Sequence, residues 1–259
     1  MSVNLDPNHS YIIIGNYGND TLALIQWAVE HALVNVTVVS VDTGWAAPSW
    51  AKHVLECEAR VREQGYQVVR LVSTTSFTNL IKQRGYFPTP KFQWCANVLK
   101  GAPILLWLDQ HDPSVSARVL LGHRRVSARS KQNLPEHISE SDSFAGRDVY
   151  YPLATMSTVK RDKLLSHAGV VPLTHRSLEC DPCINSDTFD LSLLNQDEIQ
   201  RLNELEVAVG KMMFVHLTDK LSDGGILNII KNAEKVSSSA KSSDVLENMG
   251  CGDPYGCGI

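Results

Sequence analysis

The first 125 residues alternate short apolar runs with longer segments whose apolar residues recur at helical spacing. The run at 36–41 is continuous and rich in valine, as is typical of a parallel strand buried on both faces. Leu22, Ile25, Val29 and Leu33 follow a period of three to four, which predicts a helix. The pattern predicts strands at 11–15, 36–41, 67–72, 103–108 and 118–122, and helices at 21–33, 48–64, 79–84 and 91–100.

This alternation of strand and helix predicts an α/β fold, a doubly wound and mostly parallel sheet with right-handed crossovers. Ligands in such folds bind at the carboxyl ends of the strands, near the point where the strand order reverses. The rule directs attention to the turns at 16–21, 42–45 and 122–131.

The remainder of the chain is expected to be less regular. An acidic, serine-rich stretch at 133–147 predicts a loop, 149–153 a last strand, and 158–167 and 197–214 helices. Residues 236–244 have the composition of a linker. We therefore expect a nucleotide-binding domain at 1–175, followed by a helical, cysteine-bearing extension at 176–259.

Composition narrows the class of protein. The apolar fraction of 43% supports a folded core, while no apolar run approaches the roughly 20 residues that span a bilayer. The first residues lack the basic and apolar regions of a secretory signal, so we expect a cytoplasmic protein without membrane contact. Because the net charge is −4, contact with nucleic acid would require a local basic patch.

The first turn carries polar residues that suit a phosphate. Its candidate ligands are Asn16, Gly18, Asn19, Asp20 and Thr21. Glycines let backbone N–H groups approach phosphate oxygens, and the following helix N-terminus adds positive potential. The alternative is an ordinary capped turn between a strand and a helix. The turn matches neither the P-loop nor the G-x-G-x-x-G fingerprint.

The other two turns add an acid and several cations. Asp42 and Thr43 follow the second predicted strand, where an acid can hold a ribose, a metal ion or its own turn. The third turn begins at Gly122 and carries Arg124, Arg125, Arg129 and Lys131. Guanidinium groups suit phosphate and sulfate, although a solvated basic face would have the same composition.

Six cysteines suggest a metal, redox or catalytic site. Cys180 and Cys183 form a C-x-x-C pair that can reach one metal centre, and Cys95 lies on a predicted helix. Cys251 and Cys257 are in a glycine-rich tail and could supply a fourth ligand or a mobile nucleophile. An iron–sulfur cluster, a zinc ion, a redox pair and unligated thiols all remain open at this point.

Five motifs in one order resemble the PP-loop adenine-nucleotide hydrolase superfamily, in its branch of adenylyl-sulfate and phosphoadenylyl-sulfate reductases. They are the turn Asp42-Thr43-Gly44-Trp45, the segment from Gly122 to Pro135, the element Tyr151-Pro152-Leu153, the pair Cys180-Asp181-Pro182-Cys183 and the tail Gly256-Cys257-Gly258-Ile259. The resemblance covers roughly residues 10–190 and the tail. Asp20 and Thr21 are closer to the S-G-G-x-D-S loop of the ATP pyrophosphatases, from which Asn16 and Tyr17 depart.

The resemblance implies a Rossmann-like fold, ATP and Mg²⁺ at the three turns, and a [4Fe–4S] cluster on Cys95, Cys180, Cys183 and Cys251. It implies catalytic roles for Asp20 and Cys257. The mixture of motifs is similar to the ATP-dependent sulfurtransferases, which adenylate an oxygen and replace it by sulfur.

We therefore expect DNA backbone phosphorothioation, with a cysteine desulfurase as sulfur donor, DNA as acceptor and a homodimer as the oligomer to test. The alternatives are a reductase of adenylyl sulfate or phosphoadenylyl sulfate that uses Cys257 as nucleophile, and a nucleotide-binding adaptor without turnover.

Overall fold

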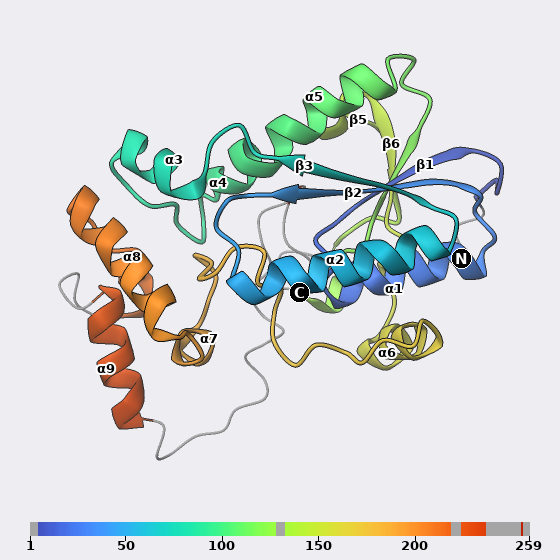
Figure 1. The fold of residues 1–259 in the computed structure, drawn as a ribbon. Coiled ribbons are helices and arrows are strands. Elements are labelled where there is room, and N and C mark those ends of the chain that lie inside the picture. The colour runs from blue at the N-terminus through green and yellow to red at the C-terminus, as the bar shows by residue number, and fades with distance from the viewer. Residues whose placement is uncertain (1–4, 128–132, 219–223, 237–254, 256–259) are drawn as a thin grey trace.

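A six-stranded sheet with helices on both faces forms the body of the protein (Figure 1). The computed structural model describes residues 5–127, 133–218, 224–236 and 255. The strands are β1 (Ser10–Ile14), β2 (Asn35–Asp42), β3 (Gln67–Val72), β4 (Arg118–Leu121), β5 (His137–Ser141) and β6 (Arg147–Tyr150). Their order is β3-β2-β1-β4-β6-β5, and every neighbouring pair is parallel except β5 with β6. This confirms the doubly wound α/β class, with the reversal of strand order between β1 and β4.

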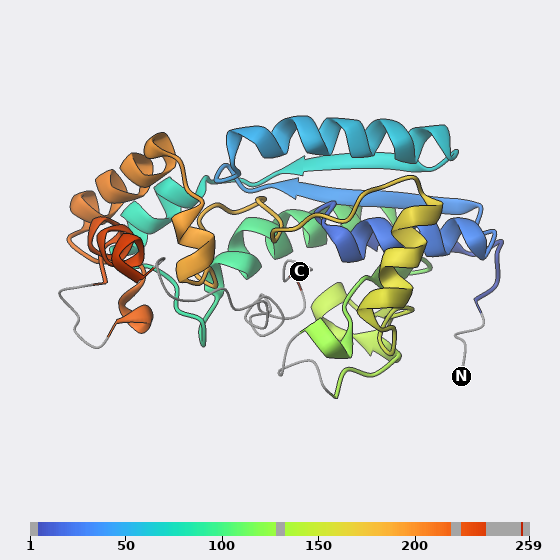
Figure 2. The same ribbon diagram turned by 90° about the horizontal axis from the view of Figure 1, so that it is seen from below.

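The helices divide between the two faces of the sheet and one end of the molecule. Helices α1 (Asn19–Glu30), α2 (Pro48–Glu63) and α6 (Thr158–His167) lie on one face, and α5 (Ala102–His111) lies on the other (Figure 1). Beyond the carboxyl edge lie α3 (Phe77–Arg84), α4 (Trp94–Ala96), α7 (Thr188–Ser192), α8 (Gln196–Val209) and α9 (Ile226–Val236) (Figures 1 and 2). Short 3₁₀ turns occur at Arg125–Ser127, Asp142–Phe144 and Val215–Leu217.

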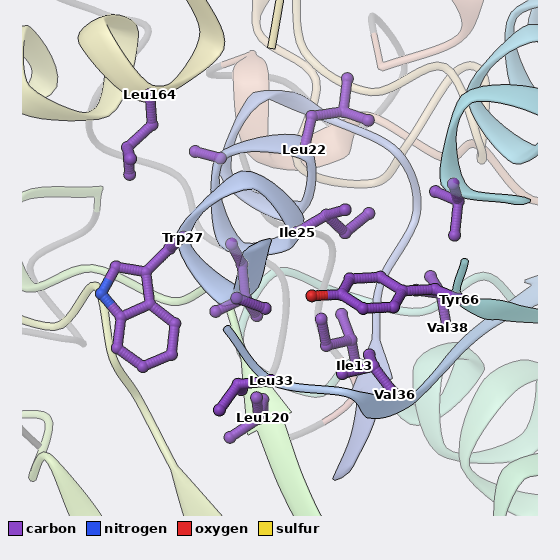
Figure 3. Close-up of a cluster of buried hydrophobic side chains, with 14 of the residues drawn as sticks. Ile13, Leu22, Ile25, Trp27, Leu33, Val36, Val38, Tyr66, Leu120 and Leu164 are labelled. Atoms are coloured by element: carbon purple, nitrogen blue, oxygen red, sulfur yellow. The ribbon is translucent and has the colours of Figure 1, made fainter. Parts of the chain in front are cut away.

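The main core lies between α1 and the sheet. Leu22, Ile25 and Trp27 of α1 pack with Ile13, Val36 and Val38 of the strands and with Leu164 of α6, as Figure 3 shows. A second core joins α3, α4, α8 and α9 around Trp45, Phe77, Leu202 and Phe214. The C-terminal helices thus share apolar contacts with the segment after β3, and the division at residue 175 stays a prediction.

Two predictions of secondary structure between residues 91 and 108 are wrong. Residues 103–108 form part of α5 rather than a strand, and the helix expected at 91–100 begins only at Trp94. A short apolar run does not by itself distinguish a strand from a buried helix. The chain runs from α4 through a π-helical turn at Asn97–Gly101 into α5, where Pro103 lies in the first turn. Proline lacks the N–H that an α-helix would use, and the wide turn precedes it.

The stretch 133–147 is also more ordered than predicted. It contains β5, which pairs with β6 in antiparallel register with an irregularity between Ile138 and Ser141. The last predicted strand, 149–153, begins earlier, at Arg147. Polar side chains on an edge strand carry no strong alternating signal, which explains the missed strand. Helix α6 has the predicted bounds, and residues 237–254 lie outside the described part of the chain.

Candidate functional site

Three adjoining cavities open at the carboxyl edge of the sheet. The switch-point pocket, between the ends of β1 and β4, is lined by residues that include Gly15, Asn16, Asp20, Thr21, Lys100, Gly122, His123, Glu179 and Tyr255. The β2 pocket includes Asn16, Tyr17, Ser40, Asp42, Thr43, Trp50, Arg70 and Glu179. The cysteine cavity includes Thr43, Trp45, Phe77, Pro88, Gln93, Cys95, Leu99, Lys100, Cys180, Cys183, Ile184 and Met213. Shared residues show that the three cavities are neighbours.

The first turn is held by its own side chains. The Asn16 Oδ1 atom accepts hydrogen bonds from Gly18 N at 2.9 Å and from the Thr21 hydroxyl at 3.3 Å. A Cβ atom on Gly15 would lie 2.4 Å from the Thr21 side chain, so only glycine fits this close approach. The Asn16 Nδ2 atom is buried without a hydrogen-bond partner among the described residues. Since buried amide donors are nearly always paired, this atom is available to a ligand.

The neighbouring Asn19 serves the fold. Its side chain donates to the Leu173 carbonyl at 2.9 Å and accepts from Leu173 N at 2.8 Å. Two hydrogen bonds to one backbone residue fix the start of α1 against the segment after α6. Of the residues predicted to bind phosphate, Asn19 is therefore engaged with the protein backbone.

Asp20 lies at the centre of a buried ion triad. Its Oδ1 atom accepts from Arg124 Nε at 2.8 Å and from Arg161 Nη1 at 3.1 Å. Burial raises the pKa of the Asp20 carboxyl, and the two guanidinium groups oppose that shift. The second oxygen, Oδ2, is buried without a hydrogen-bond partner among the described residues. Arg161 also pairs through Nε with Asp162 Oδ1 at 2.6 Å, so the two arginines and two aspartates together carry no net charge.

The third turn delivers fewer exposed cations than its sequence suggests. Arg124 is 4% exposed and is engaged by the triad. Arg125 donates from Nε to the Leu134 carbonyl at 2.9 Å. Arg129 and Lys131 lie outside the described residues. Gly122 approaches the backbone of the first turn, where a Cβ atom would lie 2.8 Å from the Asp20 carbonyl oxygen.

The β2 pocket contains two buried hydroxyl groups. Tyr17 is fully buried in a left-handed backbone conformation, with φ of 60°. Its hydroxyl oxygen and the Ser40 hydroxyl oxygen have no hydrogen-bond partner within the described ranges. Burial raises the pKa of Tyr17, so its phenol stays protonated. At the rim, the exposed Asp42 accepts a hydrogen bond from Gly44 N at 2.9 Å.

The turn after β2 anchors the C-x-x-C loop. The Thr43 hydroxyl donates to the Glu179 carbonyl at 3.0 Å, and Trp45 Nε1 donates to the Pro182 carbonyl at 3.1 Å. The Arg201 guanidinium of α8 lies 4.0 Å above the Trp45 ring. These contacts hold the cysteine-bearing loop against the sheet edge, although the two segments are more than 130 residues apart.

The structure brings three of the predicted metal ligands to one cavity. Cys95, Cys180 and Cys183 are all partly buried and line the cysteine cavity. The Cys180 thiol lies 3.4 Å from the Thr43 hydroxyl oxygen. Thiolates surrounded by apolar side chains are the usual ligand set of iron–sulfur clusters, so the donor chemistry fits such a group. Cys251 and Cys257 lie outside the described residues.

A buried ion pair joins the two sides of the site. Lys100, in the π-helical turn, forms an ion pair with Glu179, and both side chains are less than a tenth exposed. Lys100 lines the switch-point pocket and the cysteine cavity, whereas Glu179 precedes Cys180 and lines both pockets at the sheet edge. Sequence analysis missed this pair because its members are 79 residues apart.

Tyr255 also escaped sequence analysis. Its ring lies against Gly101, where a Cβ atom would come within 2.7 Å of it, and its hydroxyl donates to the Ser143 carbonyl. The ring centroid lies 5.2 Å from that of Phe144. Tyr255 thus forms one wall of the switch-point pocket. Neither a single tyrosine in a glycine-rich tail nor Arg161 in a polar helix stands out in the sequence.

Neither a metal-ion site nor a membrane-spanning helix is found among the described residues. No group of three or more His, Cys, Asp or Glu side chains in these ranges is arranged to hold a metal ion. None of the helices seen in the described parts of the chain combines the length and apolar character needed to span a membrane. The predicted cluster ligands therefore stay a prediction, with Cys251 still to be placed.

The fold has known counterparts, but the sequence has no match in two comparisons. No protein-family model and no curated protein matches it. NMN synthetase from Francisella tularensis aligns with a TM-score of 0.49 and 11% identity, over 92% of this chain and 90% of that chain. The U34-tRNA thiolase NcsA from Methanococcus maripaludis, solved with its [4Fe–4S] cluster, aligns with a TM-score of 0.50 and 12% identity, over 92% of this chain and 76% of that chain. At such low identity, the likeness to the thiolase shows a shared fold.

Proposed function

We propose that the protein is an ATP-dependent sulfurtransferase of the PP-loop type. The observation that carries the proposal is Lys100, which lines both the polar switch-point pocket and the cavity that holds three cysteines. A polar pocket for a nucleotide and a set of thiols are thus next to each other. The fold shared with a tRNA thiolase that carries a [4Fe–4S] cluster supports the same combination.

The two pockets at the sheet edge divide the nucleotide between them. The switch-point pocket receives the phosphates, because it offers the Asn16 amide and lies at the N-terminus of α1, which adds positive potential. The β2 pocket receives the adenosine, for which Trp50 is an aromatic wall and Tyr17 and Ser40 have hydroxyls to offer.

Mg²⁺ suits Asp42 better than Asp20. Asp42 is exposed at the rim of the β2 pocket, where its carboxylate accepts a hydrogen bond from the Gly44 backbone N–H. Asp20 is already neutralised by two arginines. A hard cation prefers carboxylate oxygens that are not committed to other charges. We assign Asp20 to holding Arg124 and Arg161 in place.

The acceptor that we propose is an oxygen of a DNA phosphate. It attacks the α-phosphorus of ATP and pyrophosphate leaves, and a sulfur nucleophile then displaces AMP. The protein contributes mainly by position and by fixed positive charge near the phosphates. A cysteine desulfurase supplies the sulfur. When bound at Cys95, Cys180 and Cys183, a [4Fe–4S] cluster would offer an iron at which sulfide can be held.

Pyrophosphate release from ATP tests this proposal, with protein purified without oxygen. We expect release in the presence of DNA and a sulfur donor, and iron and sulfide that are lost in Cys180→Ser and Cys183→Ser. Cys57→Ser is the control, because Cys57 is buried in the main core away from the cavity. A protein that releases no pyrophosphate would support the adaptor alternative.

The position of Tyr255 favours one second candidate, the reductase. Tyr255 lines the switch-point pocket, and Cys257 follows it by two residues in the sequence. A Cys257 thiolate would attack the sulfur of adenylyl sulfate, AMP would leave, and a thioredoxin dithiol would then release sulfite. Sulfite formation that is lost in Cys257→Ser, without pyrophosphate release from ATP, would establish the reductase.

A further inference from the structure

One long stretch of the chain contains no acidic residue. Residues 64–108 have no Asp or Glu, although the chain as a whole has 28 of them and a net charge of −4. Two cations of this stretch, Arg70 and Lys100, are neutralised by acids from other segments. The remaining three are the exposed Lys82, Arg84 and Lys91. The stretch therefore has a positive charge balance within an acidic protein.

Aromatic side chains lie between these cations. Tyr86 is 44% exposed and Phe92 is 65% exposed. The Arg84 guanidinium lies 4.2 Å from the centroid of the Trp94 ring and donates to the Tyr86 hydroxyl at 3.4 Å. The Tyr86 and Trp94 rings meet edge to face at 5.7 Å. We call Lys82, Arg84, Tyr86, Lys91 and Phe92 the basic–aromatic surface.

The turn that carries Lys91 and Phe92 is stiff. Thr89 and Phe92 exchange backbone hydrogen bonds of 3.2 and 3.0 Å across Pro90 and Lys91. The Gln93 side chain donates to the Pro90 carbonyl at 2.8 Å. A closed turn with proline inside it holds a lysine and a phenylalanine outward at little cost in entropy on binding.

We propose that the basic–aromatic surface binds single-stranded DNA. Lysine and arginine attract the phosphates, and exposed aromatic rings stack on unpaired bases, which a closed duplex does not offer. Within the described residues, no carboxylate lies within ion-pair distance of Lys82, Arg84 or Lys91.

The surface is placed to serve the cysteine cavity. Pro88 and Gln93, from the same turn, line that cavity, and Cys95 follows two residues later. Helices α3 and α4, which flank the turn, lie at the end of the molecule beyond the carboxyl edge of the sheet (Figure 1). A single DNA strand bound to this surface would have one of its nucleotides near the thiols of the cysteine cavity. The choice of DNA rests on the proposed acceptor.

Fluorescence anisotropy with an oligothymidylate of about 15 nucleotides tests the surface over a range of salt concentrations. We expect Phe92→Ala to weaken binding by roughly tenfold or more without changing the salt slope, because stacking carries no charge. We expect the double variant K82Q/K91Q to weaken binding and to lower the salt slope by about 1.4, since each phosphate contact on a single strand contributes about 0.7.

Matched controls come from other exposed sites. Phe189 is 56% exposed on α7, and Lys160 and Lys163 are exposed on α6, so F189A and K160Q/K163Q should leave binding unchanged. All variants are at exposed positions, and their thermal unfolding should match that of the wild type.

Several results would overturn the inference. They are no binding by the wild type, equal losses in the control variants, or tighter binding of duplex DNA or of the matching RNA. Displacement of the labelled DNA by polyglutamate as effectively as by unlabelled DNA would also overturn it. Pyrophosphate release from ATP is scored separately. DNA binding without pyrophosphate release would support the basic–aromatic surface and contradict the sulfurtransferase. Pyrophosphate release without DNA binding would support ATP turnover and contradict the surface.

Discussion

The switch-point pocket and the cysteine cavity share Lys100 and differ in almost everything else that lines them. The pocket is built from strand ends and holds an ion triad and an unpaired amide. The cavity is built from helices and several loops, and most of its lining is aromatic, aliphatic or cysteine. Fixed charges suit phosphate chemistry, whereas thiols and clusters need an apolar surrounding. The comparison shows one fold in which two different environments adjoin at a buried ion pair.

The largest expected effect concerns the buried charges of the pocket. Asp20→Ala leaves Arg124 and Arg161 without their common partner, and we expect a loss of about 3–5 kcal/mol in the free energy of unfolding. Urea denaturation measures it. Asp162→Asn is the control, because Asp162 meets the same Arg161 from a half-exposed position. Equal losses in both variants would show that the triad is no special centre.

The ion pair between the two regions should behave as a coupled unit. Lys100→Met alone leaves Glu179 buried without its cation, and we expect a loss of about 3 kcal/mol or more. The double variant K100M/E179M should recover most of that loss, because apolar replacements of a buried pair are often tolerated. A double-mutant cycle in urea gives the coupling, and additive losses would contradict it.

The wall formed by Tyr255 should show a steric effect. Gly101→Ala places a methyl group within 2.7 Å of the Tyr255 ring, which we expect to cost about 1–3 kcal/mol through overpacking. Combining G101A with Tyr255→Ala should remove most of the strain. Thermal unfolding compares G101A, Y255A and the double variant, and losses that simply add would contradict the steric contact.

The smallest effect lies at the C-terminal end of α5, away from both regions. Burial alone would raise the pKa of Asp112, but hydrogen bonds from Ser116 and Ala117 N–H and the Arg147 guanidinium lower it. A lowered pKa gives stability that is present above the ordinary value near pH 4 and is lost as the pH falls through the native value. We expect Asp112→Asn to have a flatter stability curve between about pH 4 and pH 2 than the wild type. An equally steep curve would contradict this.

Sequence predicted the sheet side of the molecule better than the cavity side. The turns after β1, β2 and β4 could be located because a strand followed by glycine and polar residues is a local pattern. Cys180 and Cys183 were found by their spacing. The engagement of Asp20 by Arg161 could not be read, since it joins residues 141 apart. The helical state of residues 103–108 was missed because helix and buried strand look alike over six apolar residues.

The wide π-helical turn at Asn97–Gly101 sets the angle about the helix axis between the residues before it and the residues after it. Each residue added to or removed from an α-helix rotates everything beyond it by about 100°. Here the turn stands between the Cys95 thiol and α5, and Lys100 lies within it. If the same five residues took regular α geometry, each would turn the chain further about the helix axis, and Cys95 would face another direction relative to α5. The wide turn therefore determines the direction in which the Cys95 thiol faces the cysteine cavity.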